Sequence, residues 1–345
     1  MGNVAEIFVK VLLIMAVLAA FAVPGFALKK LKMIGEGGTL TLSNLLLYVC
    51  QPALAIKAFC VFSEDDWAYI KAIEKTVILK NFGITLAISV AAMGLMLALC
   101  KLIFIKAKDK SAANVYSFVA VFSNCGFFGI PFVEMFTGGN PLATMYMMVF
   151  NVVFTVMCWT VGVVLITGNL KDIKIKKLVL NPALISIVIA LVFFFVPQIN
   201  FFMFDEVAEL RIFPQYLAYM TAPLSMIIVG IRIAETPAKQ LFCKKGVYLA
   251  GGLRLIIAPF LTLVISLPFW GILGSGVESG FEEYVYLAPV IAMTMSPAAS
   301  VVAMAETFGG DKETATAAFV TNTIISIVTI PLVIMAVMAI CGLSV

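Results

Sequence analysis

Long apolar stretches recur along almost the whole chain and constrain its fold more than any other feature. A helix rises about 1.5 Å per residue, so about 20 apolar residues cross the hydrocarbon core of a bilayer. We expect ten such spans, near residues 5–28, 38–59, 81–105, 111–137, 141–167, 181–198, 213–234, 246–269, 285–309 and 313–341. Of the 345 residues, 63% are hydrophobic and 12% are charged, too little polar surface for a soluble globule. The chain is therefore predicted to be an all-α polytopic membrane protein.

The composition also excludes several kinds of site. The seven cysteines lie mostly inside apolar runs without a C-x-x-C pair, and the chain has no histidine. Zinc and haem sites, an imidazole proton relay and the common enzymatic constellations need such residues. We therefore expect no enzyme, no cofactor and no metal site. The net charge of +4 comes from lysines in short loops, so we expect no nucleic-acid partner either.

The basic residues set the orientation of the spans. The loops after odd-numbered spans hold 16 of the 23 lysines and arginines. Loops on the other side are richer in acids, among them Glu64, Asp65 and Asp66. Because cytoplasmic loops carry an excess of Lys and Arg, the odd loops are predicted to face the cytoplasm. Both termini are then extracytoplasmic, in a multi-pass protein of a cell membrane (plasma or inner).

Two spans are interrupted at their midpoints by polar residues, small residues and proline. These residues are Ser123, Asn124, Cys125 and Gly126 in the fourth span and Ser296, Pro297 and Ala298 in the ninth. An unsatisfied backbone group in hydrocarbon costs several kcal/mol, so both helices are predicted to break there. Two broken spans, one in each half of a chain, are typical of a transporter's binding site.

The two halves of the chain repeat each other. A shift of 171 residues superposes prolines and asparagines, and a shift of 172 superposes two glutamates. The pairs are Pro52 and Pro223, Asn151 and Asn322, and Glu134 and Glu306. Each half holds five spans, so the second must enter the membrane from the opposite side. We expect inverted five-helix repeats at 1–167 and 181–345, a short cytoplasmic linker at 168–180, and helices 4 and 9 crossing at mid-membrane.

The crossing is predicted to bind a small anion. Half-helices that start near Gly126 and Ala298 point free N–H groups and positive dipole ends at one volume. Asn124 can donate and accept hydrogen bonds there, or it can cap its half-helix. Ser123 and Ser296 add hydroxyl groups.

Five further residues have two interpretations each. Asn151 and Asn322 either contact the ligand or hydrogen-bond between helices. Arg254, about eight residues into its span, is either a counter-ion for a substrate or acid, or a long side chain that extends to the cytoplasmic surface. Glu134 and Glu306 either serve the coupling ion or lie at solvated helix ends.

Several motifs resemble the auxin efflux carrier family. They are distributed over nearly the whole chain, and the asparagine before G-x-x-G-I-P is the most specific point. The motifs are Y-V-C-Q-P-A-L (48–54), S-N-C-G-F-F-G-I-P (123–131), A-P-L-S-M-I-I-V-G (222–230), M-S-P-A-A-S-V-V-A-M-A-E-T-F-G-G-D (295–311) and N-T-I-I-S-I-V-T-I-P (322–331).

The resemblance implies a fold related to bile-acid/sodium symporters, with helices 4 and 9 crossing at the substrate site. Helices 1, 2, 6 and 7 are then a scaffold, against which helices 3–5 and 8–10 move as an elevator. Asn124 takes the position of the family's substrate-contacting asparagine, and Pro297 that of a crossing proline. Plant auxin carriers have a proline where this chain has Ser123, and many have a long central loop where this chain has residues 168–180. The two departures argue against auxin as the substrate, and the compact form without a long loop resembles the bacterial branch described as malonate or malate permeases.

The predicted function is secondary active transport of small organic anions by elevator-type alternating access. The substrates are mono- or dicarboxylates such as malate or malonate, or auxin-like weak acids. The alternative is a sodium/proton-coupled cation antiporter, which needs an aspartate beside the crossing, or a bile-acid-type sodium symporter. The expected partners are the small organic anion and the lipid bilayer. The sequence leaves open the coupling ion, proton or sodium, and whether the chain forms a homodimer.

Overall fold

The structure is a computed structural model that describes residues 4–35, 37–241, 244–273 and 283–342. These residues form helices and no β-strand, and seven of the helices are long and apolar enough to cross a membrane. The seven are Ala5–Lys30, Gly38–Cys60, Lys75–Phe104, Pro141–Thr167, Glu206–Glu235, Lys245–Phe269 and Lys312–Cys341. Shorter apolar helices are Cys125–Phe136, Pro182–Phe195 and Tyr284–Thr294. The prediction of an all-α polytopic membrane protein is confirmed, whereas the number of ten spans stays a prediction.

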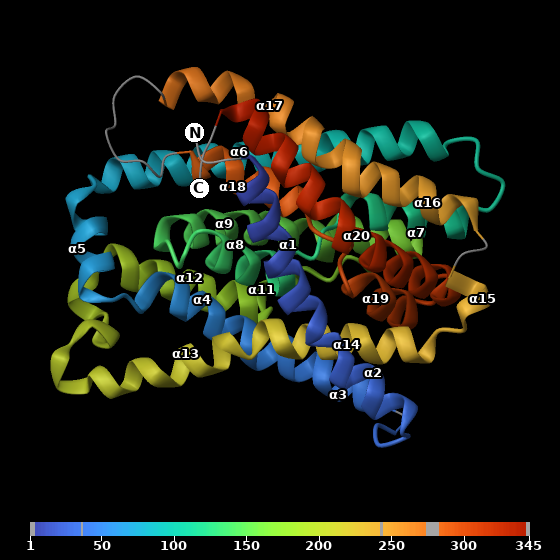
Figure 1. Cartoon of the computed structure of the whole chain (residues 1–345), viewed down its shortest axis with the longest axis horizontal. Helices are drawn as coiled ribbons and strands as arrows, with labels where there is room; N and C mark the ends of the chain where they lie inside the picture. Colours follow the sequence, from blue (N-terminus) through green and yellow to red (C-terminus); the bar gives the residue numbers. More distant parts are fainter. Residues whose placement is uncertain (1–3, 36, 242–243, 274–282, 343–345) are drawn as a thin grey trace.

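The long helices lie in layers (Figure 1). Helices α6 (Lys75–Phe104) and α17 (Ala258–Leu273) run along one side of the molecule and pack on each other. Helices α13 (Ile212–Tyr219) and α14 (Thr221–Glu235) run along the opposite side. Helix α1 (Val4–Ala20) crosses the region between them. The chain ends, residues 1–3 and 343–345, lie outside the described residues.

One group of helices gathers around α14. Helix α2 (Ala22–Lys30) packs along α14, and α4 (Gln51–Cys60) packs on α12 (Pro182–Phe195) and α13. The contact between α2 and α14 is close, because a Cβ at Gly25 would lie 2.0 Å from the carbonyl oxygen of Ile227. A Cβ at Gly230 would lie 1.9 Å from the carbonyl oxygen of Ala22. Glycine therefore allows the two backbones to touch, as small residues do between membrane helices.

The other long helices form a second group. Helix α9 (Pro141–Met157) packs on α6 and α18 (Tyr284–Thr294). Helix α16 (Lys245–Gly252) packs on α7 (Lys110–Val121) and on α20 (Lys312–Cys341). Helix α1 packs on α20 of this second group and also contacts α14 of the first group. The first span therefore contacts both groups.

Both predicted interruptions are present. Helix α7 ends at Val121, and the chain becomes helical again at η2 (Cys125–Gly129), which continues as α8 (Ile130–Phe136). Helix α18 ends at Thr294, and α19 (Ser300–Phe308) begins after a bend that contains Pro297. Each span is therefore two half-helices joined by a few extended residues.

Four short π-helical segments were not predicted. They are η1 (Leu46–Cys50), η2, η3 (Cys158–Gly162) and η8 (Leu253–Ile257). A π turn is an insertion into an α-helix that rotates the side chains that follow it, and it often occurs at functional sites.

Several boundaries differ from the predicted spans. Helix α6 begins at Lys75 rather than at 81, since lysines at a helix end can extend their ammonium groups to the membrane surface. Helix α12 ends at Phe195 because Pro197 starts a 3₁₀ turn. The remaining elements are α3 (Gly38–Leu45), α5 (Glu64–Ala72), α10 (Val163–Thr167), η4 (Leu170–Asp172), α11 (Ile175–Val179), η5 (Pro197–Ile199), η6 (Phe201–Met203), η7 (Asp205–Arg211) and α15 (Ala238–Leu241).

Candidate functional site

The two interrupted spans meet at their breaks through one isolated antiparallel β-bridge. The backbone N–H of Asn124 donates to the carbonyl oxygen of Ser296 at 2.8 Å, and the N–H of Ala298 donates to that of Phe122 at 2.9 Å. Ser123 and Pro297 face each other between these bonds. Proline has no N–H to donate, and none is needed at this position. The pairing satisfies backbone groups that the breaks would leave exposed in a low-dielectric interior.

Two helix N-termini begin beside this pairing. Segment η2 starts at Cys125 and α19 starts at Ser300. The expected starting points were Gly126 and Ala298. The second start lies later because Pro297 is held in the bridge and a turn with i→i+3 bonds follows it, from the Val301 N–H to the Ala298 carbonyl oxygen at 3.2 Å and from the Val302 N–H to that of Ala299 at 3.3 Å. The first N–H groups of a helix have no partner within that helix, so each terminus carries about half a positive charge.

Neither N-terminus is closed by a side chain. Asn124 occupies the N-cap position of η2 but makes no side-chain cap hydrogen bond, and Ala299 before α19 has no side chain that could make one. The interpretation in which the Asn124 side chain caps its half-helix is therefore wrong. Its side chain is only 3% exposed, so a polar amide lies beside two uncapped termini in a nearly closed environment.

Polar side chains around the crossing are buried and incompletely hydrogen-bonded. Ser123 and Ser296 are each 1% exposed, and the Ser296 hydroxyl has no partner among the described residues. A buried polar group without a partner costs about 1–3 kcal/mol and is rare in native proteins. Such groups mark the crossing as a place where a ligand can supply the missing partner.

Asn151 reaches the crossing from α9 and connects it to α4. Its Oδ1 accepts a hydrogen bond from the Cys125 thiol at 3.6 Å, and its Nδ2 donates to Oε1 of Gln51 at 3.5 Å. The Gln51 Nε2 has no partner among the described residues, although Gln51 is buried. A Cβ at Gly126 would lie 2.6 Å from the Asn151 Oδ1 and 3.1 Å from the Gln51 Nε2.

Sequence reasoning missed Gln51. It lies within the Y-V-C-Q-P-A-L motif at 48–54, directly before Pro52. The signal that could have found it is a glutamine inside an otherwise apolar span. In the structure, Gln51 directly follows the π segment η1.

Asn322 lies in a different environment from Asn151. Its Nδ2 donates to the carbonyl oxygens of Val247 at 3.1 Å and Ala318 at 2.9 Å. The ideal Cβ position of Gly251 is 1.9 Å from the Asn322 Oδ1, so the amide lies against that glycine. These contacts tie α20 to α16 and correspond to the interpretation as a hydrogen bond between helices.

Arg254 is fully buried and lies across the carboxyl ends of two half-helices. Its Nη1 donates to the carbonyl oxygens of Val121 at 2.9 Å and Ala120 at 3.3 Å, at the end of α7. Its Nε donates to that of Met295 at 3.2 Å, and its Nη2 donates to that of Met293, at the end of α18. The interpretation in which this side chain extends to the membrane surface is therefore wrong, because the backbone of the crossing binds it instead.

The two paired glutamates form ion pairs at the ends of their half-helices. Glu134 on α8 binds Lys57 on α4, with 2.6 Å between Oε1 and Nζ. Glu306 on α19 binds Lys312 at 3.0 Å and Arg232 on α14 at 3.3 Å. In each case one partner belongs to the helices around α14, so the glutamates connect the two groups of helices.

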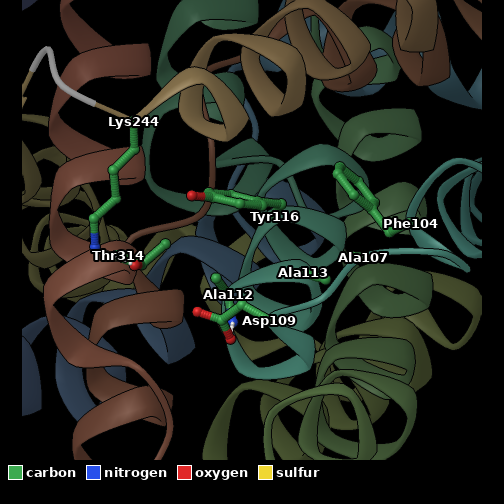
Figure 2. A pocket seen from close by; sticks show the side chains of 8 residues that line it. All are labelled: Phe104, Ala107, Asp109, Ala112, Ala113, Tyr116, Lys244 and Thr314. Carbon is green, nitrogen blue, oxygen red and sulfur yellow. Dashed lines mark hydrogen bonds between the residues drawn. The ribbon is translucent and has the colours of Figure 1, made fainter.

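A cavity of about 330 Å³ lies away from the crossing (Figure 2). Figure 2 shows Lys244 extending toward Thr314, whose Oγ1 lies 2.8 Å from the lysine Nζ, with the ring of Tyr116 nearby. Asp109 and Phe104 also line this cavity. None of the predicted site residues lines this cavity.

Comparison with known proteins identifies the chain at the level of a family. No curated protein matches it significantly. The model of a family described as membrane transport protein matches residues 4–334, which include both broken spans and every predicted site residue. The chain therefore belongs to the membrane transport protein family, the auxin efflux carrier family whose motifs it carries.

Proposed function

We propose that the protein is a secondary active transporter of small organic anions, with mono- or dicarboxylates such as malonate or malate as substrates. Membership of a membrane transport family supports a small-molecule substrate and a membrane location rather than an enzyme. The observation that carries the choice of an anion is the crossing itself. Two uncapped helix N-termini, the buried amide of Asn124 and the unpartnered hydroxyl of Ser296 converge there. A carboxylate accepts hydrogen bonds from all of these groups.

Asn124 is the central substrate ligand in this proposal. It can donate its amide to a carboxylate oxygen, while Ser123, Cys125, Gly126, Ser296, Pro297 and Ala298 shape the surrounding volume. Gln51 and Asn151 border the same volume from the two groups of helices. The unpartnered Nε2 of Gln51 adds one more donor for an anion.

Transport follows from movement of one group of helices against the other. We assign the first, second, sixth and seventh predicted spans, which include α2, α4, α12, α13 and α14, to a scaffold. The third to fifth and eighth to tenth spans, with both broken spans, are the moving transport domain. In support, the crossing lies at the border between the groups, where η2 contacts α14 and the Ser225 hydroxyl donates to the carbonyl oxygen of Phe127 at 3.2 Å. Inverted repeats at 1–167 and 181–345, joined by 168–180, agree with the two symmetric breaks.

The rival function, sodium/proton-coupled cation exchange, needs a buried carboxylate beside the crossing. Among residues whose burial the structure describes, Arg254 is the only buried one with a formal charge. A positive group disfavours a cation at the same place. The crossing therefore favours an anion over a cation.

The test is flux through the purified protein in liposomes. Labelled malonate, malate, succinate and indole-3-acetate are offered with and without proton or sodium gradients. We expect saturable uptake of at least one carboxylate, and Asn124→Ala should raise its apparent KM about tenfold, because a hydrogen bond to a charged group is lost.

The control variant is Asn169→Ala, which removes an exposed asparagine from the 168–180 connection and should leave uptake unchanged. If Asn124→Ala transports with the apparent KM of the natural protein, the site is misassigned. If no carboxylate is transported under any gradient, the proposed function is wrong.

A further inference from the structure

Arg254 binds four carbonyl oxygens, all at the carboxyl ends of helices. Two of its donors serve the last residues of α7, and the others serve the last turn and C-cap of α18. The remaining polar contact, Nη2 to the Met293 sulfur at 3.5 Å, belongs to the same helix end. The guanidinium thus has no donor left for a substrate. Its role cannot be the direct contact that the sequence suggested as one alternative.

The helix dipoles explain what this arrangement does. Each broken span contributes one carboxyl end and one amino end to the crossing, with about −0.5 and +0.5 of an elementary charge respectively. Without Arg254 these four ends sum to about zero. The single positive charge of the guanidinium lies on the two negative ends and compensates about one full charge. The two amino ends of η2 and α19 then remain as an uncompensated positive charge of about one.

Among the residues whose burial the structure describes, no acidic side chain is buried, so none lies at the crossing to cancel that charge. The described ion pairs lie at helix ends and in loops, and none of them includes Arg254. The four carbonyl groups that bind the guanidinium carry partial charges only. A buried charge without an acidic partner lowers the stability of a protein. A charged residue inside a membrane span therefore indicates a functional role.

We propose that Arg254 is a positioning residue that sets the charge selectivity of the crossing without touching the substrate. It fixes the carboxyl ends of α7 and α18 against each other and cancels their negative dipole ends. The amino ends of η2 and α19 can then attract an anion. This role rests on the proposed function, and it assigns anion selectivity to a residue behind the binding volume.

The π segment η8 supports this role. Arg254 is its second residue, and the segment lies between the α-helices α16 and α17. The extra residue of a π turn changes the direction of the side chains around it. Here the guanidinium ends on carbonyl groups of two other spans.

The experiment compares an anion with its neutral analogue. Binding of malonate and malonamide is measured by calorimetry on the purified full-length protein, on Arg254→Gln and on Arg254→Lys. The natural protein should bind malonate at least about tenfold more tightly than malonamide, as expected from one nearby unit charge in a partly shielded site. Arg254→Gln should reduce this preference to about threefold or less, because the amide keeps some donors but no charge.

Arg254→Lys keeps the charge but loses the planar fork of donors. It should therefore keep most of the malonate preference while its thermal unfolding temperature falls. The matched control is Arg211→Gln, an arginine that donates to the carbonyl oxygen of Phe202, outside both broken spans. A purely structural role of Arg254 would weaken the binding of both probes equally and leave their ratio unchanged.

The outcomes separate this inference from the proposed function. If the natural protein prefers malonate and Arg254→Gln keeps that preference, or Arg254→Lys loses it, Arg254 does not set the selectivity and only this inference is wrong. If the natural protein binds both probes equally, the crossing has no anion preference and both the inference and the proposed substrate class are wrong.

Discussion

Gly126 lies at a place in the crossing that leaves no room for a side chain. A Cβ there would meet the amides of Asn151 and Gln51, which are themselves held between two helices. We expect Gly126→Ala to lower the free energy of unfolding by about 1–3 kcal/mol and to abolish carboxylate uptake, since the neighbouring amides must move. Thermal unfolding in detergent and liposome flux measure the two effects.

Gly94 provides the matched control. It lies inside helix α6, where an added Cβ meets nothing within 4 Å. Gly94→Ala should be neutral or stabilise the protein by up to about 1 kcal/mol, because alanine favours a helix. If both variants behave alike, the close contact at Gly126 does not constrain the crossing.

Single residues differ in how well the sequence predicts them. Asn124 and Ser296 could be found, because a polar residue in the middle of an apolar span is conspicuous. The role of Arg254 could not be predicted, because its partners are backbone carbonyl groups near residues 120 and 293. Every residue has a backbone carbonyl group, so the sequence does not show which of them bind a side chain. The different roles of Asn151 and Asn322 were equally hidden, because both occupy equivalent places in the repeat.

The pairing of the two broken helices allows a direct chemical test. Ser123 and Pro297 face each other between two cross-strand bonds, a position where Cβ atoms lie about 4.5–5.5 Å apart and a disulfide can form with small adjustment. The double variant Ser123→Cys with Pro297→Cys should form this disulfide on mild oxidation. Mass spectrometry of proteolytic fragments detects the linked peptides.

The single variants and an Ala113→Cys with Pro297→Cys pair are the controls. Ala113 lies near the start of α7, more than two helical turns before the break. Linked peptides in the control pair, or none in the Ser123–Pro297 pair, would contradict the crossing.

The elements were predicted in outline but not in detail. The breaks in spans 4 and 9 follow from polar residues and proline in hydrocarbon, and they are present. The four π segments could not be predicted, because one inserted residue hardly changes an apolar pattern. The start of α19 lies two residues later than expected for a tertiary reason, since the bridge to Ser123 holds Pro297 out of the helix and a short turn follows it.

The ion pair between Lys57 and Glu134 connects the proposed scaffold and transport domain. Both side chains are at least four-fifths buried, and the lysine ammonium also lies 4.6 Å from the ring centre of Tyr219. We expect Lys57→Met and Glu134→Gln each to lower the free energy of unfolding, with a coupling of about 1 kcal/mol in the double variant. The exchanged pair Lys57→Glu with Glu134→Lys should regain most of the loss. Thermal unfolding of the four proteins measures the cycle.

The more exposed pair between Lys244 and Glu313, at 3.6 Å, is the control. Glu313→Gln should change stability by no more than about 0.5 kcal/mol, because water screens an exposed pair. A coupling near zero for Lys57 and Glu134 would show that the two groups of helices are not held together there.

The orientation of the whole molecule is testable by labelling from one side of the membrane. Asp65 at the start of α5 and Lys108 between α6 and α7 are exposed, and Figure 1 shows these regions at opposite ends of the molecule. A membrane-impermeant maleimide applied to intact cells should label Asp65→Cys and leave Lys108→Cys unlabelled, because basic loops stay in the cytoplasm. The opposite pattern would reverse the predicted orientation, including that of both termini.

The glycine contact between α2 and α14 has a consequence for the molecule as a whole. Side chains usually separate two helices, and their rotamers can adjust when one helix moves. At Gly25 and Gly230 nothing of this kind intervenes, since each glycine faces a backbone oxygen of the other helix. Sliding or rotating one helix would force main-chain atoms to overlap. The contact between α2 and α14 is therefore expected to stay rigid, and we expect conformational changes of the protein to leave these two helices fixed relative to each other.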